Sequence, residues 1–315
     1  MKKSILLFII LFSAICFSQE KNEKDLFNKE EITINSLLKG SLYSPLKQNK
    51  KTTLVILIAG SGPTDRDGNQ KGLTNNSLKY LSEELARNEI AVFSYDKRII
   101  AQMLSGTVNE ATLSFDDFIN DAKEVLTFFK NKKKYNKIII AGHSEGSLIG
   151  MIAANGNANA FISLAGAGRT IDLVIEDQIE KQAPFLKDEV QKNLETLKKG
   201  ETFELKNPML ASLFRESVQP YMISWIKYNP QDEIKKLQIP VLIINGTKDL
   251  QVKVTEAELL KQANPNAKME IIENMNHLFK EIKGDEKENM TSYTNPDLPV
   301  MKELISKINL FIKAL

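Results

Sequence analysis

The chain has 315 residues, of which 42% are hydrophobic, with 15 glycines and 10 prolines. This is the ordinary composition of a globular protein that holds one large or two average domains. Its 42 lysines and arginines nearly balance its 40 aspartates and glutamates. The balance argues against a nucleic-acid partner, because proteins that bind nucleic acids usually carry a basic excess.

The first eighteen residues have the layout of a secretory signal peptide. Two lysines precede an apolar run from Ile5 to Phe12, and small residues lead up to Gln19. The run is shorter than the ~20 residues that span a bilayer. We therefore expect cleavage after Ser18 and a mature chain, residues 19–315, that is exported to the periplasm or beyond and has no stable membrane span. Cys16 would carry the lipid of a lipoprotein, but the bulky Ile15 before it disfavours that processing.

Cleavage at this position would also change the composition of the mature protein. It would remove the only cysteine together with Lys2 and Lys3, leaving 40 basic and 40 acidic residues. We therefore expect no disulfide and no thiol chemistry.

The order of apolar patterns along the mature chain predicts an α/β fold. Residues 31–45 alternate apolar and polar side chains around Gly40, which is typical of an antiparallel hairpin. Continuous apolar runs, typical of parallel strands buried on both faces, follow at 54–58, 90–93, 137–141, 160–164, 241–244 and 269–272. Amphipathic helix patterns occur at 77–88, 115–129, 147–154, 254–263 and 301–315. Such alternation predicts a doubly wound, mostly parallel sheet.

A glycine-rich loop, A-G-S-G-P-T-D-R-D-G-N (residues 59–69), follows the first of these strands. It lacks the third glycine of a dinucleotide loop, since Asp65 stands there, and no G-K-S/T follows to make a phosphate loop. An EF-hand counted from Asp65 would need glycine and glutamate where Gln70 and Asn76 stand. The remaining interpretation is a loop that offers backbone N–H groups to a reaction intermediate.

The sequence G-H-S-E-G (residues 142–146) lies between a predicted strand and a predicted helix. This is the context of a nucleophile elbow, in which a serine sits on a turn too tight for neighbouring side chains. Ser144 is therefore the candidate nucleophile. The N–H groups of Ser61, in the glycine-rich loop, and of Glu145, after the nucleophile, are the candidate oxyanion-hole donors.

Residues 168–236 break the alternation, because they contain helical patterns and no strand. We expect a helical lid inserted between the sixth and seventh strands of the sheet, over the edge where ligands bind in α/β folds. Most of its large apolar residues are expected to pack within the lid; they are Met209, Leu210, Leu213, Phe214, Tyr221, Met222 and Trp225.

A serine nucleophile needs a base and an acid partner, and the sequence offers few choices. The chain has two histidines, and His143 inside the elbow is better interpreted as structural, so His277 is the candidate base. Asp249 follows a predicted strand and is the candidate acid. The order Ser144, Asp249, His277 is the one that α/β hydrolases use. Asp172 and Asp232 compete for the acid role, but both fall in the predicted lid.

Five stretches of the sequence resemble the α/β-hydrolase superfamily, and within it a group of bacterial, often exported, carboxylesterases. They are A-G-S-G-P-T-D-R-D-G, S-Y-D-K-R, A-G-H-S-E-G, N-G-T-K-D-L-Q-V and M-N-H-L-F. The resemblance implies hydrolysis of carboxylic esters, usually with short acyl chains, without a metal or cofactor. It assigns the same roles to Ser144, Asp249 and His277. One departure is Ala59, where many hydrolases have histidine.

The sequence therefore predicts a serine carboxylesterase that acts on small-molecule esters through an acyl-enzyme. A peptidase, thioesterase or acyltransferase with the same triad remains an alternative, because these reactions share one mechanism. A catalytically silent binding protein is a further alternative. The sequence leaves the natural substrate, the oligomeric state and the roles of Asp65, Arg66 and Asp67 open.

Overall fold

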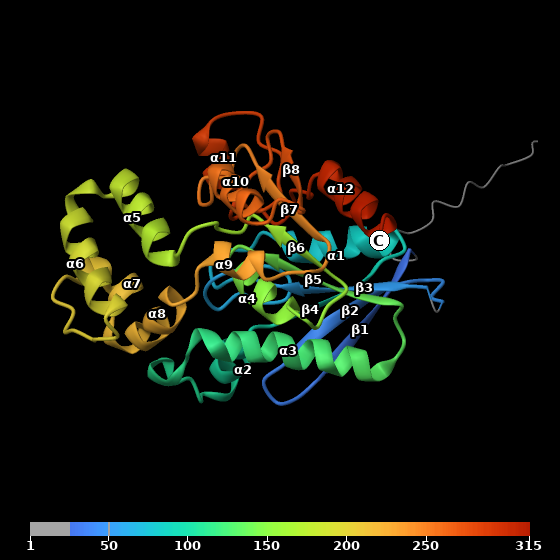
Figure 1. Cartoon of the computed structure of the whole chain (residues 1–315), viewed down its shortest axis with the longest axis horizontal. Helices are drawn as coiled ribbons and strands as arrows, with labels where there is room; N and C mark the ends of the chain where they lie inside the picture. The colour runs from blue at the N-terminus through green and yellow to red at the C-terminus, as the bar shows by residue number, and fades with distance from the viewer. Residues whose placement is uncertain (1–25, 50) are drawn as a thin grey trace, which may run out of the picture.

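Eight strands of the computed structural model form a single sheet in the order β1-β2-β4-β3-β5-β6-β7-β8 (Figure 1). The structure describes residues 26–49 and 51–315, so the predicted signal peptide lies outside it. The strands are β1 (Phe27–Thr33), β2 (Lys39–Pro45), β3 (Thr53–Ile58), β4 (Ala91–Tyr95), β5 (Lys137–His143), β6 (Ala160–Leu164), β7 (Val241–Gly246) and β8 (Lys268–Ile272).

The sheet is parallel except at its N-terminal hairpin. β1 pairs with β2 and β2 with β4 in antiparallel fashion, whereas β3 to β8 pair in parallel with their neighbours. The predicted mostly parallel α/β-hydrolase sheet is thus confirmed. Gly40 is not the hairpin turn, however. It lies inside β2 opposite Ile32, where a Cβ atom would come within 2.6 Å of the Phe93 ring.

Helices cover both faces of the sheet because successive strand residues point to opposite sides. Leu54, Ile56 and Ile58 of β3 join the core beneath α3, α4 and α10, whereas Val55 and Leu57 join the core beneath α1 and α12. These helices are α1 (Ser77–Arg87), α3 (Phe115–Lys132), α4 (Glu145–Ala154), α10 (Val254–Ala263) and α12 (Lys302–Lys313). All five coincide with predicted amphipathic segments.

The helices inserted between β6 and β7, except the last, form a separate layer that projects beyond the C-terminal ends of the strands (Figure 1). They are α5 (Ile171–Gln182), η3 (Pro184–Leu186), α6 (Lys187–Lys198), η4 (Pro208–Leu210), α7 (Ala211–Phe214), η5 (Glu216–Val218) and α8 (Gln219–Ile226). The last inserted helix, α9 (Pro230–Lys235), packs against α4 and α10. The insert has its own apolar core, which includes Val190, Leu194 and Phe214. It therefore folds around itself while it borders the strand ends.

Three short helices were not predicted from the sequence. They are α2 (Arg98–Ser105), η2 (Glu110–Thr112) and α11 (Glu286–Ser292). No residue of α2 is buried, so this helix is not part of the core. Within the described residues, no helix has the length and hydrophobicity needed to cross a membrane.

Candidate active site

The turn that carries Ser144 can form only because glycines flank it. Ser144 has φ 55° and ψ −121°, a strained conformation for a residue with a side chain. A Cβ atom on Gly142 would lie 2.0 Å from the Gly146 carbonyl oxygen, and one on Gly146 would lie 2.5 Å from the Ala59 oxygen. The two glycines therefore let β5 turn directly into α4 and bring the elbow against the end of β3.

Asp249 and His277 meet at the neighbouring strand ends. His277 Nδ1 donates to Asp249 Oδ2 at 2.8 Å, and both side chains are almost fully buried. The other carboxylate oxygen, Oδ1, accepts the backbone N–H groups of Gln251 and Val252, each at 2.8 Å. This anchoring fixes which oxygen faces the imidazole and leaves His277 Nε2 as the nitrogen available to accept a proton.

The loops that carry these two residues are packed and hydrogen-bonded. Gly246 lies against the histidine loop so closely that a Cβ atom would come within 2.0 Å of the Met275 oxygen. The buried Asn276 accepts the N–H groups of Leu278 and Lys280, and its amide donates to Asn289 and Ser292. His277 is therefore held by a rigid turn.

The chain connects Ser144 to this pair through its neighbour His143. Ser144 follows His143, whose ring centroid is 4.7 Å from that of His277. Within the part of the chain that the structure describes, the Ser144 hydroxyl makes no side-chain capping bond at α4, and no hydrogen bond to His277 is formed. Serine–histidine contacts are often loose without substrate and tighten in the complex.

His143 has a structural position. Its Nε2 lies 2.9 Å from the His277 carbonyl oxygen, and its ring packs edge-on against Phe279. Burial, reinforced by the nearby His277, lowers the pKa of His143 from 6.5 to about 3. The ring is therefore neutral at ordinary pH, and its Nε2–H donates to the carbonyl that precedes the Leu278 amide.

This histidine makes folding stability depend on pH. Because the folded-state pKa lies below the unfolded value, its contribution is complete above pH 6.5 and is lost as the pH falls toward 3. When the pH is lowered from 7.5 to 5, we expect this one group to lower the free energy of unfolding by on the order of 2 kcal/mol. Urea unfolding of the wild type and of His143→Gln at both pH values measures this change in the free energy of unfolding. An equal loss in the variant would contradict this assignment.

The glycine-rich loop is braced by its own polar side chains. The Ser61 carbonyl accepts Thr64 Oγ1 and Gln70 Nε2, both at 2.8 Å. Gly62 has φ 78°, a conformation that favours glycine. Among the described residues, no acceptor is recorded for the Ser61 N–H. The Glu145 N–H, in the first turn of α4, also has no partner within its helix. Both candidate donors are therefore free to bind a ligand oxygen.

The charged residues Asp65, Arg66 and Asp67 in the second half of this loop brace it. Asp65 accepts the N–H groups of Asp67 and Asn69, closing the turn on itself. The Arg66 guanidinium pairs with Glu31 of β1 and with Asp96, which directly follows β4, and so links the loop to both strands. None of these three acidic or basic side chains borders the cavity described below. Among the described residues, no group of three or more potential metal-binding side chains lies together.

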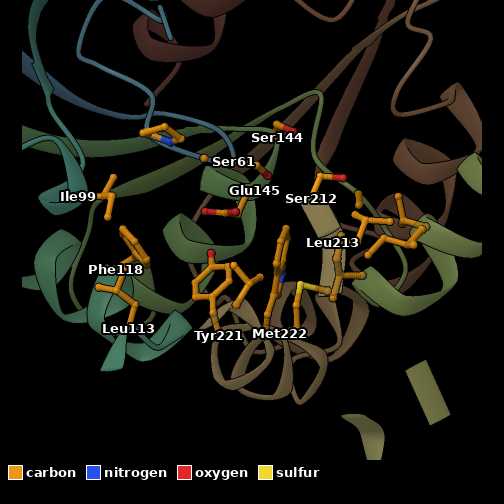
Figure 2. Close-up of a pocket in the computed structure, with 18 of the residues that line it drawn as sticks. Ser61, Ile99, Leu113, Phe118, Ser144, Glu145, Ser212, Leu213, Tyr221 and Met222 are labelled. Carbon is orange, nitrogen blue, oxygen red and sulfur yellow. The ribbon is translucent and has the colours of Figure 1, made fainter. Parts of the chain in front are cut away.

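A cavity of about 420 Å³ opens in front of Ser144 (Figure 2). Ser61, Ser144 and Glu145 form one end, and the remaining wall is mainly apolar. Body residues on the wall include Ile99, Leu113 and Phe118; insert residues include Ile171, Val174, Ile175, Leu213, Val218, Tyr221, Met222 and Trp225. The volume suits a small organic ligand, and the apolar wall suits its hydrocarbon part.

Most large apolar residues of the insert pack within it, as expected. Leu210, Phe214 and Met222 lie in the insert's core, Leu213, Tyr221 and Trp225 pack against that core, and Met209 is exposed. Leu213, Tyr221, Met222 and Trp225 also border the cavity, which was not expected. The three of these in α8 do so because α8 packs on the start of α3, where Trp225 stacks on Phe115 with centroids 5.4 Å apart. That docking is a tertiary contact without a sequence signal.

Neither of the two competing carboxylates borders the cavity in front of Ser144. Asp172 is paired with Lys198 within the insert at 3.0 Å, and Asp232 is in α9.

Sequence reasoning missed Lys97, whose buried ammonium pairs with Glu145 at 2.6 Å. The only available signal was its place in the S-Y-D-K-R stretch.

The model of the BD-FAE family matches residues 41–263. This range includes the strands from β3 to β7, the insert and all candidate residues except His277. The chain belongs to the BD-FAE family.

This BD-FAE family member is also similar to individual esterases. It is 28% identical over 273 residues to the esterase EstD of Thermotoga maritima, covering 85% of this chain and 63% of EstD. The chain thus spans less than two thirds of that relative's length. Est1E from Butyrivibrio proteoclasticus, a structure also solved with ferulic acid bound, has a TM-score of 0.58 at 18% identity, covering 91% of this chain and 99% of Est1E. The Pyrococcus furiosus esterase Pf2001 gives 0.55 at 17% identity, covering 94% of each chain. These structures share the fold.

Proposed function

We propose that the protein is a serine carboxylesterase that hydrolyses small carboxylic esters, with Ser144 as nucleophile, His277 as base and Asp249 as the orienting acid. The observation that carries the proposal is the buried Asp249–His277 pair, bonded at 2.8 Å, together with a glycine-flanked serine that borders an apolar cavity. The similarity to EstD supports the same reaction class.

The reaction would proceed in two displacements. Ser144 Oγ attacks the ester carbonyl carbon while His277 Nε2 takes the hydroxyl proton. The oxygen that becomes negative accepts the N–H groups of Ser61 and Glu145. His277 then gives its proton to the leaving alkoxide, so the C–O bond breaks and the alcohol departs. Water repeats the sequence on the acyl-enzyme and releases the acid and the free serine.

A series of p-nitrophenyl esters from acetate to dodecanoate tests this function. We expect saturable turnover by the wild type, no turnover by Ser144→Ala, and falling kcat/KM as the acyl chain outgrows the 420 Å³ cavity. Folded wild-type protein without turnover on any ester would contradict the proposal. Methyl ferulate belongs in the series because Est1E binds ferulic acid.

The insert is proposed to act as a lid that sets the length of the acyl chain. Leu213 is half-buried and lies on the cavity wall, at the edge of the insert's core. We expect Leu213→Trp to lower kcat/KM about tenfold more for octanoate than for acetate, because filled volume excludes the longer chain first. Met209→Trp, at a 62% exposed position outside the cavity wall, is the matched control. Equal effects on both esters would argue against this role of the insert.

We also propose export, with removal of residues 1–18. The N-terminal lysines and the short apolar run support it. N-terminal sequencing of protein from the extracytoplasmic fraction should begin at Gln19, and a retained Met1 in a cytoplasmic fraction would contradict it.

A further inference from the structure

The stretch Asp96-Lys97-Arg98 directly follows β4 and supplies none of the groups that react in the proposed ester hydrolysis. Its three side chains reach three different segments. Asp96 holds Arg66 of the glycine-rich loop, Lys97 reaches Gly60 and Glu145, and Arg98 pairs with Asp117 and Asp121 of α3. Because β3 lies between β4 and β5 in the sheet, Lys97 spans the ends of three adjacent strands.

Lys97 is buried, and its ammonium contacts three groups. Its Nζ lies 3.1 Å from the Gly60 carbonyl oxygen, 2.6 Å from Glu145 Oε1 and 4.4 Å from the centroid of the Phe118 ring. The Lys97 and Glu145 side chains are 4% and 1% exposed. A buried ion pair is often no more stable than an apolar pair of the same size. Stability alone therefore does not account for this pair.

The contact with Gly60 determines where the Ser61 N–H points. The Gly60 carbonyl and the Ser61 N–H belong to one peptide group, which is trans and planar, so the two bonds point in opposite directions. With the carbonyl held toward Lys97, the N–H faces away from Lys97. Hydrogen bonding of a carbonyl to a cation also polarises the peptide and strengthens its N–H as a donor.

The contact with Glu145 acts on the other candidate donor. Glu145 is the first residue of α4, and its side chain is tied to the same ammonium that holds the Gly60 carbonyl. One cation thus connects the two separate chain segments that supply the oxyanion hole. Their relative position determines whether both N–H groups reach one oxygen.

We propose that Lys97 is a positioning residue of the oxyanion hole, which orients the Gly60–Ser61 peptide and ties it to the residue after the nucleophile. This inference rests on the proposed esterase function. It makes Lys97 important for the transition state, where negative charge develops, and of little importance for substrate binding.

The test uses the double variant Lys97→Met/Glu145→Gln. Lys97→Met alone leaves the Glu145 carboxylate buried without its cation and is expected to unfold more easily. The double variant removes both charges and keeps the Glu145 backbone N–H. Arg98→Met is the control, because it breaks a neighbouring buried ion-pair network in α3 without touching either donor segment. For each protein the readouts are the thermal midpoint, kcat and KM for p-nitrophenyl butyrate, and Ki for butyl trifluoromethyl ketone.

The trifluoromethyl ketone reports on the hole directly. Ser144 Oγ adds to its carbonyl carbon, His277 takes the serine proton, and the carbonyl oxygen becomes the oxyanion of a reversible hemiketal. In the folded double variant we expect kcat to fall roughly 10- to 100-fold with KM nearly unchanged, and Ki to weaken by the same factor. Arg98→Met should lower the thermal midpoint and leave kcat, KM and Ki at their wild-type values.

Three outcomes overturn the inference. If the folded double variant keeps kcat and Ki within about twofold of wild type, or if its loss lies in KM alone, Lys97 does not position the hole. Failure of the wild type itself to hydrolyse the ester would overturn the proposed function together with the inference. Wild-type turnover with an unaffected variant would overturn the inference alone.

Discussion

Ser144→Ala is expected to lower kcat for ester hydrolysis by about 10⁶-fold while the protein remains folded. Without Oγ no acyl-enzyme forms, and the remaining groups can only assist direct attack by water. Because alanine removes one atom at a position facing the cavity, little packing is lost. Initial rates on p-nitrophenyl butyrate, with the thermal midpoint measured on the same preparation, give the result.

Ser147→Ala is the matched control for this change. Ser147 lies one turn along α4, is fully buried, and bonds Ser163 at 2.8 Å. Losing that bond is expected to lower stability by about 1 kcal/mol and to leave kcat unchanged. If Ser144→Ala instead kept a tenth or more of wild-type kcat, Ser144 would not be the nucleophile.

Asp249→Asn is expected to lower kcat by about 10⁴-fold with KM nearly unchanged. The cause follows from the anchoring of the carboxylate. Two backbone N–H groups bind Oδ1, so the asparagine oxygen would occupy that site and its NH₂ group would face His277 Nδ1. The imidazole would then carry its proton on Nε2, and that nitrogen could not accept the proton of Ser144.

The control for this prediction is Asp232→Asn. Asp232 is exposed at the start of α9 and is the competing carboxylate from the sequence. It should leave kcat at the wild-type value. Loss of activity in Asp232→Asn, with full activity in Asp249→Asn, would transfer the acid role to the insert.

The sheet and the order of the candidate residues were predictable because they rest on local patterns. Strands buried on both faces read as continuous apolar runs, as at 137–141, and the glycines around Ser144 mark a turn that admits no Cβ atom. Gly40 shows the limit of such reasoning. A glycine is required at this position because the Phe93 ring, on a strand more than fifty residues away in the chain, leaves no room for a Cβ atom. No turn is involved.

The walls of the cavity could not be predicted because they depend on docking between distant segments. Leu210 and Leu213 stand three residues apart, yet Leu210 is fully buried in the insert's core, whereas Leu213 lies at the edge of that core and borders the cavity. Lys97 likewise looked like one cation among 42. Only the fold shows that its side chain turns inward to Glu145, 48 residues along the chain.

The central claim, that Ser144 is an activated nucleophile, is tested most directly by covalent labelling. A fluorophosphonate loses fluoride to an activated serine and leaves a stable phosphonyl adduct that mimics the acyl-transfer transition state. After incubation, intact mass and peptide mass spectrometry should show a single adduct on Ser144, with none in Asp249→Asn over the same time. Folded wild-type protein that stays unlabelled, or that is labelled at another residue, would contradict the account.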